Sequence, residues 1–395
     1  MLAIESPDVA IRRGIGRGPF PFLSLLPVRS LPMLQFVSML AAIALTAFCW
    51  GVYGPVLHIG SGQLGSALRA FMCVGMAYFG IAIVVPLAIL GKSGEKGSWT
   101  KAGVLWSLLA GAAGALGALG VILAVRVFGG QPIYVMPLVF GGAPVVNTLL
   151  NATLTKSFNQ LKAPFLAGLI LVITGAATVL IFKPVAPHSA PKAVAAATAT
   201  DSAVADTPAE KPAAPQGLVP KVEQRAEKFL GVLLSAAMAM LSWGAYGPVL
   251  HKGQTAMGGS RLRPLICIGV SYFLIAVLVP LALLGPTGDK GTWDTTGLLW
   301  SLGAGSLGAL GALGTILAFA NGGKPFTVMP VVFGCAPVIN TFTTLALAET
   351  APETVKPIFL AGLLVVAAGA ATVLAFGPRG HAPGKPHGPG APAAT

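Results

Sequence analysis

An internal repeat at a separation of 193 to 194 residues constrains this chain more than any other feature of its sequence. WGVYGPVLH at residues 50–58 recurs as WGAYGPVLH at residues 243–251. VMPLVFGGAPVVNT at residues 135–148 recurs as VMPVVFGCAPVINT at residues 328–341, with three differences in fourteen positions. Long-range similarity of this kind means two copies of one structural unit. We therefore expect a chain of two similar halves.

Each half contains five apolar runs long enough to cross a lipid bilayer, which needs about 20 residues of helix. Only 9% of the residues are charged, against about 25% in soluble domains. This composition excludes a soluble enzyme and a disordered chain. The expected spans are residues 33–55, 68–90, 102–126, 132–152, 163–183, 229–250, 263–285, 296–320, 326–348 and 356–377. The sequence therefore predicts an all-α integral membrane protein with ten transmembrane helices.

The odd number of spans in each half determines how the halves are related. Five crossings end on the side of the membrane opposite to where they began, so the second copy enters from the other side. The expected architecture is two inverted five-helix repeats, at residues 33–183 and 229–377. With the N-terminus inside, cytoplasmic segments carry fifteen Lys and Arg residues and outside segments ten. This bias favours a plasma (inner) membrane protein with cytoplasmic N- and C-termini.

Three segments lack apolar periodicity. Residues 1–32 form a cytoplasmic N-terminal tail, residues 184–228 an Ala- and Pro-rich linker, and residues 378–395 a C-terminal tail. We expect the linker and the C-terminal tail to be disordered. The charged end of the linker, residues 221–228, can instead extend the sixth helix. The net charge of +13 comes from tails and loops without a basic-aromatic patch, so no nucleic-acid partner is expected.

Aromatic rings with polar tips recur at matching positions of the two halves. In the first helix of each half a Trp and a Tyr stand three residues apart and share one helix face. These rings can stack on a polar organic substrate, and the alternative is an aromatic belt at the lipid headgroups. A second Trp of the third helix can reach either a cavity or an interface. The candidate substrate-binding aromatic residues are Trp50, Tyr53, Trp106, Trp243, Tyr246 and Trp300.

Repeated prolines predict irregular helices, because proline lacks a backbone donor and clashes with the preceding turn. The first helix of each half is expected to be kinked or partly unwound at its WGxYGPVLH segment, which is tolerable only beside protein or a water-filled cavity. The fourth helix carries two prolines in each half. The predicted kink positions are Pro55, Pro137, Pro144, Pro248, Pro330 and Pro337.

Two further pairs supply polar chemistry at membrane depth. Asn147 and Asn340 must each face a partner helix or a cavity, because an unpaired amide in hydrocarbon is costly. Lining a substrate cavity and joining helices are equally good interpretations. His58 and His251 are candidates for proton coupling, since histidine titrates near neutral pH. The alternative is an interfacial side chain that hydrogen-bonds a loop.

The third helix of each half carries GALGALG, at residues 114–120 and 308–314. No strand precedes this glycine series and it lies in an apolar run, which argues against a nucleotide-binding loop. Small residues on one face allow two membrane helices to approach closely. We therefore assign this face to helix packing.

Several chemistries find no support in the sequence. No Asp or Glu lies inside a predicted span, which argues against carboxylate proton relays and carboxylate sodium sites. No catalytic triad, metal-ligand spacing or P-loop is present, and the four cysteines fall singly in apolar runs. We expect neither an enzyme nor a bound cofactor or metal.

Two homologous five-helix halves with a WG motif in the first helix of each resemble the drug/metabolite transporter superfamily, with its EamA-like repeats. The motif stands at Trp50-Gly51 and Trp243-Gly244 and is similar to that of the sugar-uptake branch, which includes glucose/ribose and rhamnose transporters. The resemblance covers both membrane segments and not the linker or tails. It implies a central cavity between the halves, alternating access, and export or uptake of small metabolites.

The sequence thus favours a secondary transporter or facilitator of small polar organic metabolites. An uncharged, sugar-like solute suits stacking rings and amides, because no intramembrane carboxylate or buried Arg is at hand as a counter-ion. The alternative is a non-transporting membrane scaffold or sensor that retains the repeat for folding. A cavity lined by the paired residues favours transport, and a dry interface favours the scaffold. The expected partners are the solute and membrane lipid, and a homodimer is compatible with the sequence.

The repeat makes a direct topological prediction. Reporter fusions after Lys183 and after Phe376 should lie on opposite sides of the membrane, the first outside and the second inside, because five spans separate the two positions. Alkaline phosphatase and green fluorescent protein fusions measure this in intact cells. Reports from the same side would contradict inverted halves.

Overall fold

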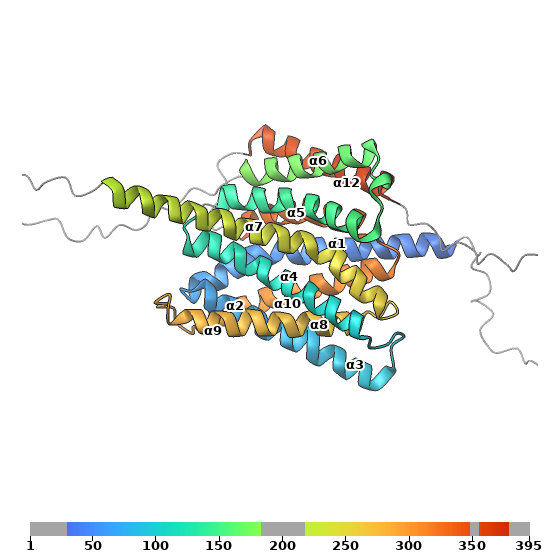
Figure 1. Cartoon of the computed structure of the whole chain (residues 1–395), viewed down its shortest axis with the longest axis horizontal. Helices are drawn as coiled ribbons and strands as arrows, with labels where there is room; N and C mark the ends of the chain where they lie inside the picture. Colours follow the sequence, from blue (N-terminus) through green and yellow to red (C-terminus); the bar gives the residue numbers. More distant parts are fainter. Residues whose placement is uncertain (1–29, 131, 183–217, 348–354, 379–395) are drawn as a thin grey trace, which may run out of the picture.

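The computed structural model describes residues 30–130, 132–182, 218–347 and 355–378. All the regular structure in these residues is helical (Figure 1). Ten helical segments are long and apolar enough to cross a membrane, one for each predicted span. The prediction of an all-α membrane fold with ten spans is therefore confirmed.

The ten spans are built from twelve α-helices and three π-helical turns among the described residues. In the first half they are α1 (Ser30–Gln63), α2 (Ala67–Tyr78), η2 (Phe79–Val84), α3 (Val85–Ser93), α4 (Lys101–Ile122), η3 (Leu123–Val127), α5 (Pro132–Thr155) and α6 (Ala163–Ile181), with a short 3-10 turn η4 (Phe158–Gln160). In the second half they are α7 (Leu218–Ala256), α8 (Leu262–Phe273), η5 (Leu274–Leu278), α9 (Val279–Leu284), α10 (Thr295–Ala320), α11 (Pro325–Ala346) and α12 (Pro357–Phe376). The π turns join their neighbouring helices into single spans.

The first helix of each half is longer than predicted. α1 continues to Gln63, and α7 begins at Leu218, inside the segment assigned to the linker. Trp50 and Trp243 consequently lie well inside their helices rather than at the ends. α7 takes in the charged residues 221–228, as one of the two interpretations of that segment proposed.

The helices continue through the six repeated prolines, so the segments at Pro55 and Pro248 are not unwound, and a kink there stays a prediction. A proline ring clashes with the carbonyl four residues earlier. That residue is Gly51 for Pro55 and Gly244 for Pro248, and a glycine can adjust its backbone with little steric cost. Two of the three π turns lie instead before a different pair of equivalent prolines, Pro86 and Pro280.

The two halves are packed into each other rather than side by side. α1 lies along α10 and α11 of the second half, while α7 lies along α4 and α5 of the first half. α6 and α12 pair with each other. In Figure 1, α1 starts at the right-hand side of the molecule and α7 at the left-hand side, so the two equivalent helices run in opposite directions.

Two equivalent tryptophan–glycine contacts hold the halves together, one from each half to the other. The indole Nε1–H of Trp50 donates to the carbonyl of Gly308 at 3.2 Å, and that of Trp243 donates to the carbonyl of Gly114 at 3.2 Å. Any Cβ added at Gly311 would meet the Trp50 ring. The GALGALG face thus receives the tryptophan of the opposite half, which explains why both motifs are repeated.

Equivalent residues of the two copies also meet each other directly. The rings of Tyr78 and Tyr272 are stacked with their centroids 3.7 Å apart and an interplanar angle of 2°. The rings of Phe79 and Phe273, one position further along, are 5.1 Å apart. Equivalent residues of the two copies therefore meet where the halves pack against each other.

Two equivalent loops tie the halves together at opposite ends of the molecule. Asp289 accepts hydrogen bonds from Ser66 and from Arg69 Nε, the latter at 2.8 Å. Glu95 likewise accepts from Ser260 at 2.6 Å, and Arg263 lies 3.5 Å from it. Burial raises the pKa of Asp289, but hydrogen bonds from Ser66, Arg69 and the Gly291 N–H, together with the Arg69 charge, lower it below its ordinary value.

The tryptophan contacts predict a difference between two glycines of α10. Gly311→Ala should lower the melting temperature of the detergent-purified protein, because overpacking costs about 1–3 kcal/mol. Gly303→Ala is the matched control, because a Cβ there meets nothing within 4 Å. Both variants gain the same helix propensity, so the control should be neutral or slightly more stable. Equal melting temperatures would contradict the role assigned to the GALGALG face.

Candidate functional site

A cavity of about 860 Å³ lies between the two halves. This volume falls within the roughly 300–1,000 Å³ of small-molecule sites. Its deep part is lined by aromatic rings from both halves, namely Trp50, Tyr53, Tyr78, Phe140, Trp243, Tyr246, Tyr272 and Phe333. Equivalent aromatic residues of both halves therefore line the cavity.

The aromatic walls are held in place by contacts with one another and with the backbone. Trp50 and Tyr246 make an edge-to-face contact across the halves, with centroids 5.6 Å apart. Phe140 lies 5.7 Å from Trp243 and 6.2 Å from Phe333. Both indole N–H groups are already bonded to backbone carbonyls. The rings thus present rigid apolar faces, which suit a planar or apolar part of a solute.

Polar groups enter the cavity mainly from α1 and α11. The amide of Asn340 lies against Gly54, where a Cβ would stand 2.6 Å from Nδ2, so the close approach requires glycine there. The hydroxyl of Thr344 donates to the Asn340 carbonyl at 2.8 Å, and that of Ser61 donates to the His58 carbonyl at 3.0 Å. Because those two hydroxyl protons are bonded to the backbone, the Asn340 amide is the better candidate to bind a solute.

The structure brings together most, but not all, of the predicted site residues. Outside the cavity, the Trp106 ring lies 4.1 Å from the Lys252 ammonium, and Trp300 lines a separate open groove of about 500 Å³ on α10. Of the predicted site residues, the cavity is lined by Trp50, Tyr53, Trp243, Tyr246 and Asn340, together with His58, Pro55 and Pro337.

Asn147 and Asn340 occupy equivalent positions in different surroundings. Asn147 is completely buried, and its Nδ2 donates to the carbonyl of Pro325 at 2.9 Å. This bond joins α5 to the start of α11. The sequence left helix joining and cavity lining open for both residues, and this structure shows Asn147 joining helices and Asn340 lining the cavity.

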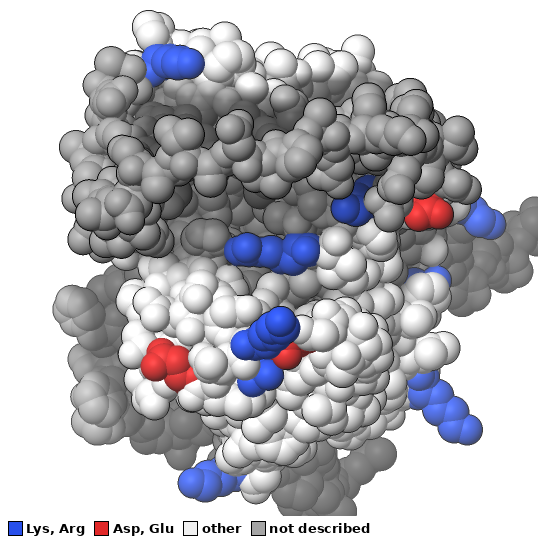
Figure 2. Space-filling model, turned by 90° about the vertical axis from the view of Figure 1, so that its left-hand side faces the viewer, with Lys and Arg blue, Asp and Glu red and all other residues white. Residues whose placement is uncertain are grey.

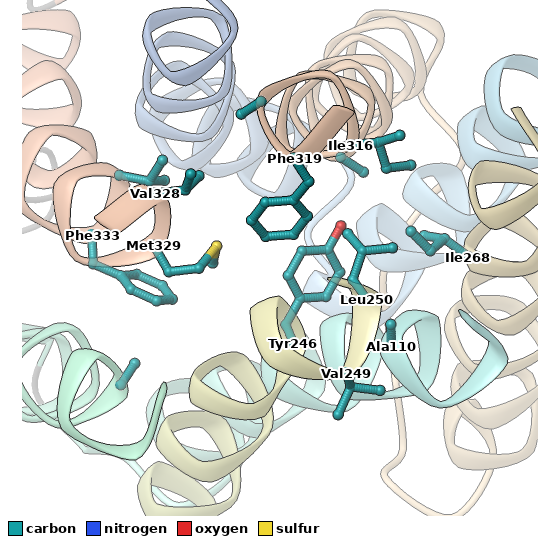
Figure 3. Packing of buried hydrophobic residues seen from close by; sticks show 14 of the residues in the cluster. Ala110, Tyr246, Val249, Leu250, Ile268, Ile316, Phe319, Val328, Met329 and Phe333 are labelled. Atoms are coloured by element: carbon teal, nitrogen blue, oxygen red, sulfur yellow. The ribbon is translucent and has the colours of Figure 1, made fainter. Parts of the chain in front are cut away.

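The end of the molecule that contains Asn147 is filled. Leu250, Phe319, Val328 and Met329 are buried there, and Figure 3 shows Tyr246, Phe319 and Met329 directed into the space between α7, α10 and α11. His251 packs its ring 5.0 Å from Phe319, edge to face. This arrangement closes the cavity on one side.

At the opposite end the cavity reaches the surface between the last turns of several spans. The lining residues there include the exposed side chains of His58 on α1, Arg126 on η3 and Leu347 just after α11. Figure 2 views the end of the molecule to which these helices run, where Lys and Arg side chains stand among mostly uncharged residues. One end is therefore open and the other closed.

Arg126 is a lining residue that the sequence did not single out, because it stands at the very end of the predicted span 102–126. A signal was nevertheless present in the repeat. The two copies are 194 residues apart at Gly120 and Gly314, but 193 apart at Gly130 and Gly323. The first copy therefore contains one additional residue, and the π turn η3, which carries Arg126, accommodates it.

Metal chemistry finds no structural support in the described part of the chain, where no three His, Cys, Asp or Glu side chains come together. Of the four cysteines, Cys49, Cys73 and Cys267 are buried and Cys335 is partly buried, all without a disulfide.

No family model and no curated protein matches this sequence. Among solved structures, a chain described as "Crystal structure of protein" is similar in fold, with a TM-score of 0.52 and 16% sequence identity. The similarity covers 87% of this chain and 96% of that chain. At this level of identity it shows a shared fold alone.

Proposed function

We propose that this chain is a secondary transporter or facilitator of small organic solutes. The observation that carries the proposal is the cavity of about 860 Å³, lined by both halves, open at one end and closed at the other. A non-transporting scaffold would need no such space on its axis. The chain is then a member of the drug/metabolite transporter superfamily, in the plasma membrane, with cytoplasmic N- and C-termini.

The mechanism proposed is alternating access by two inverted repeats. Because the two halves carry the same motifs at equivalent positions, each would adopt the conformation that the other has now. In the opposite state, Asn340 would donate to the backbone carbonyl of Pro132, the equivalent of Pro325, while Asn147 would face the cavity. Exchange of these two bonds would close the present opening and open the other end.

The cavity walls define what the solute must offer. Ring faces of Trp50 and Tyr53 suit an apolar or planar surface, and the Asn340 amide can both donate and accept a hydrogen bond. A sugar-like solute matches these groups, because sugar rings present apolar faces edged by hydroxyls.

The test is binding and exchange by the purified protein. A thermal-shift screen against sugars, amino acids, amines and organic acids should give at least one solute that stabilises the protein and exchanges in proteoliposomes. Asn340→Ala should weaken its binding about 3- to 10-fold, the value of one hydrogen bond. Trp300→Ala, with its ring in the separate groove, should leave binding unchanged.

The same experiment distinguishes the scaffold alternative. A protein that no solute stabilises and that exchanges none would favour a scaffold or sensor. Equal effects of Asn340→Ala and Trp300→Ala on binding would place the binding site outside the cavity.

A further inference from the structure

The cavity contains one charged side chain among the described residues that line it, and this is Arg126. Its side chain is exposed, and its Nη2 lies 3.5 Å from His58 Nδ1, at the outer limit of a hydrogen bond. The two ion pairs among the described residues join Arg69 to Asp289 and Arg263 to Glu95, so neither uses Arg126. No Asp or Glu is present among the described lining residues.

Arg126 breaks the symmetry of the fold. The residues that hold the halves together are repeated, including the Trp, Tyr and Gly residues of the interlocked helices. In the second copy, residues Phe319 to Asn321 occupy the place of Val125 to Phe128, with one residue fewer and no cation. A residue that serves only to maintain the symmetric scaffold would be expected in both copies. Arg126 is therefore better explained by a role in the cavity.

The local helix geometry gives the same indication. α4 ends in the π turn Leu123–Val127, whereas α10 remains α-helical to Ala320. The backbone N–H of Phe128 donates five residues back to Leu123 at 2.9 Å, while that of Asn321 donates four residues back to Leu317 at 3.0 Å. An inserted residue of this kind is frequent at functional sites. Here the turn carries Arg126 among the lining residues.

We propose that the cavity selects solutes with an anionic group, bound by Arg126, on an apolar or aromatic body. The guanidinium is permanently charged and matches a carboxylate through paired hydrogen bonds. The rings deeper in the cavity, such as Trp50 and Tyr53, would hold the body. This inference rests on the proposed transport function and replaces the uncharged sugar-like solute by an organic carboxylate.

A solute carboxylate and a lipid phosphate are both anions that an arginine at this depth can bind. The solute is favoured because Arg126 lines the same cavity as the Trp50 and Trp243 rings, which lie between the halves. An anionic lipid headgroup would bind at the rim without filling the aromatic part. The experiment therefore contains one arm for each source.

The test measures affinity for matched solutes by thermal shift and calorimetry of the full-length protein in phosphatidylcholine nanodiscs. Each set has one body, phenyl, indolyl or cyclohexyl, carrying a carboxylate, a primary amide or an alcohol. At least one carboxylate should bind about ten-fold or more tightly than its amide, as expected for a charged hydrogen bond. Arg126→Gln should abolish that preference and leave the amide affinity unchanged.

Two controls separate charge at the site from charge in general. Lys356→Gln removes an exposed cation outside the cavity lining and should retain the preference. Arg126→Lys keeps the positive charge and should retain part of the preference for the carboxylate. In the lipid arm, phosphatidylglycerol nanodiscs should stabilise wild type and Arg126→Gln equally.

Three results would overturn the inference. Neutral solutes that bind as tightly as their carboxylates would contradict the anion preference but leave the transport proposal intact. Stabilisation by phosphatidylglycerol that depends on Arg126, without solute binding, would assign the arginine to lipid. Absence of binding by all solutes, charged and neutral, would contradict the proposed transport function itself.

Discussion

The rest of the structure depends on one kind of contact. In each half, a tryptophan packs against the glycine face of the other half. Trp50 on Gly308 and Gly311, and Trp243 on Gly114, draw α1 and α7 into the opposite halves. Because both indole N–H groups find a backbone carbonyl, these large side chains satisfy their polar atom within the membrane. The other aromatic rings of these helices then lie between the halves. The cavity and its aromatic walls therefore follow from the same contacts that join the halves.

Equivalent residues in different surroundings give the two ends of the molecule different structures. Asn147 bonds to the Pro325 carbonyl at the filled end, while Asn340 lines the cavity at the open end. In the proposed alternating access, the exchanged arrangement would use equivalent groups, because Asn340 and Pro132 correspond to Asn147 and Pro325. Departures from the repeat, by contrast, indicate what is specific to this protein. The clearest of these is the additional residue in the π turn η3, the turn that carries the lining residue Arg126.

Length and apolarity were enough to predict the ten spans, because the requirement to cross hydrocarbon leaves few alternatives. The same patterns gave Trp50, Tyr53 and their partners as cavity residues. They could not separate Asn147 from Asn340, since the difference is conformational and not chemical. The ends of α1 and α7 were missed because helical hydrogen bonding continues into polar residues beyond the apolar run. The sequence left open whether Trp106 and Trp300 reach the cavity or an interface, because periodicity gives the face of a helix but not its neighbour.

The central claim is that the cavity is open at the Asn340 end and closed at the Asn147 end. Chemical modification of single cysteines tests it most directly, with Asn340→Cys and Asn147→Cys each made in a variant without the native cysteines. A small, charged thiol reagent that cannot cross the membrane is added from either side of sealed vesicles, and the modified fraction is measured by mass spectrometry. The account predicts rapid modification at position 340 from the side that also exposes the segment after α6, and protection of position 147 from both sides. Modification of position 147 with protection of position 340 would contradict it.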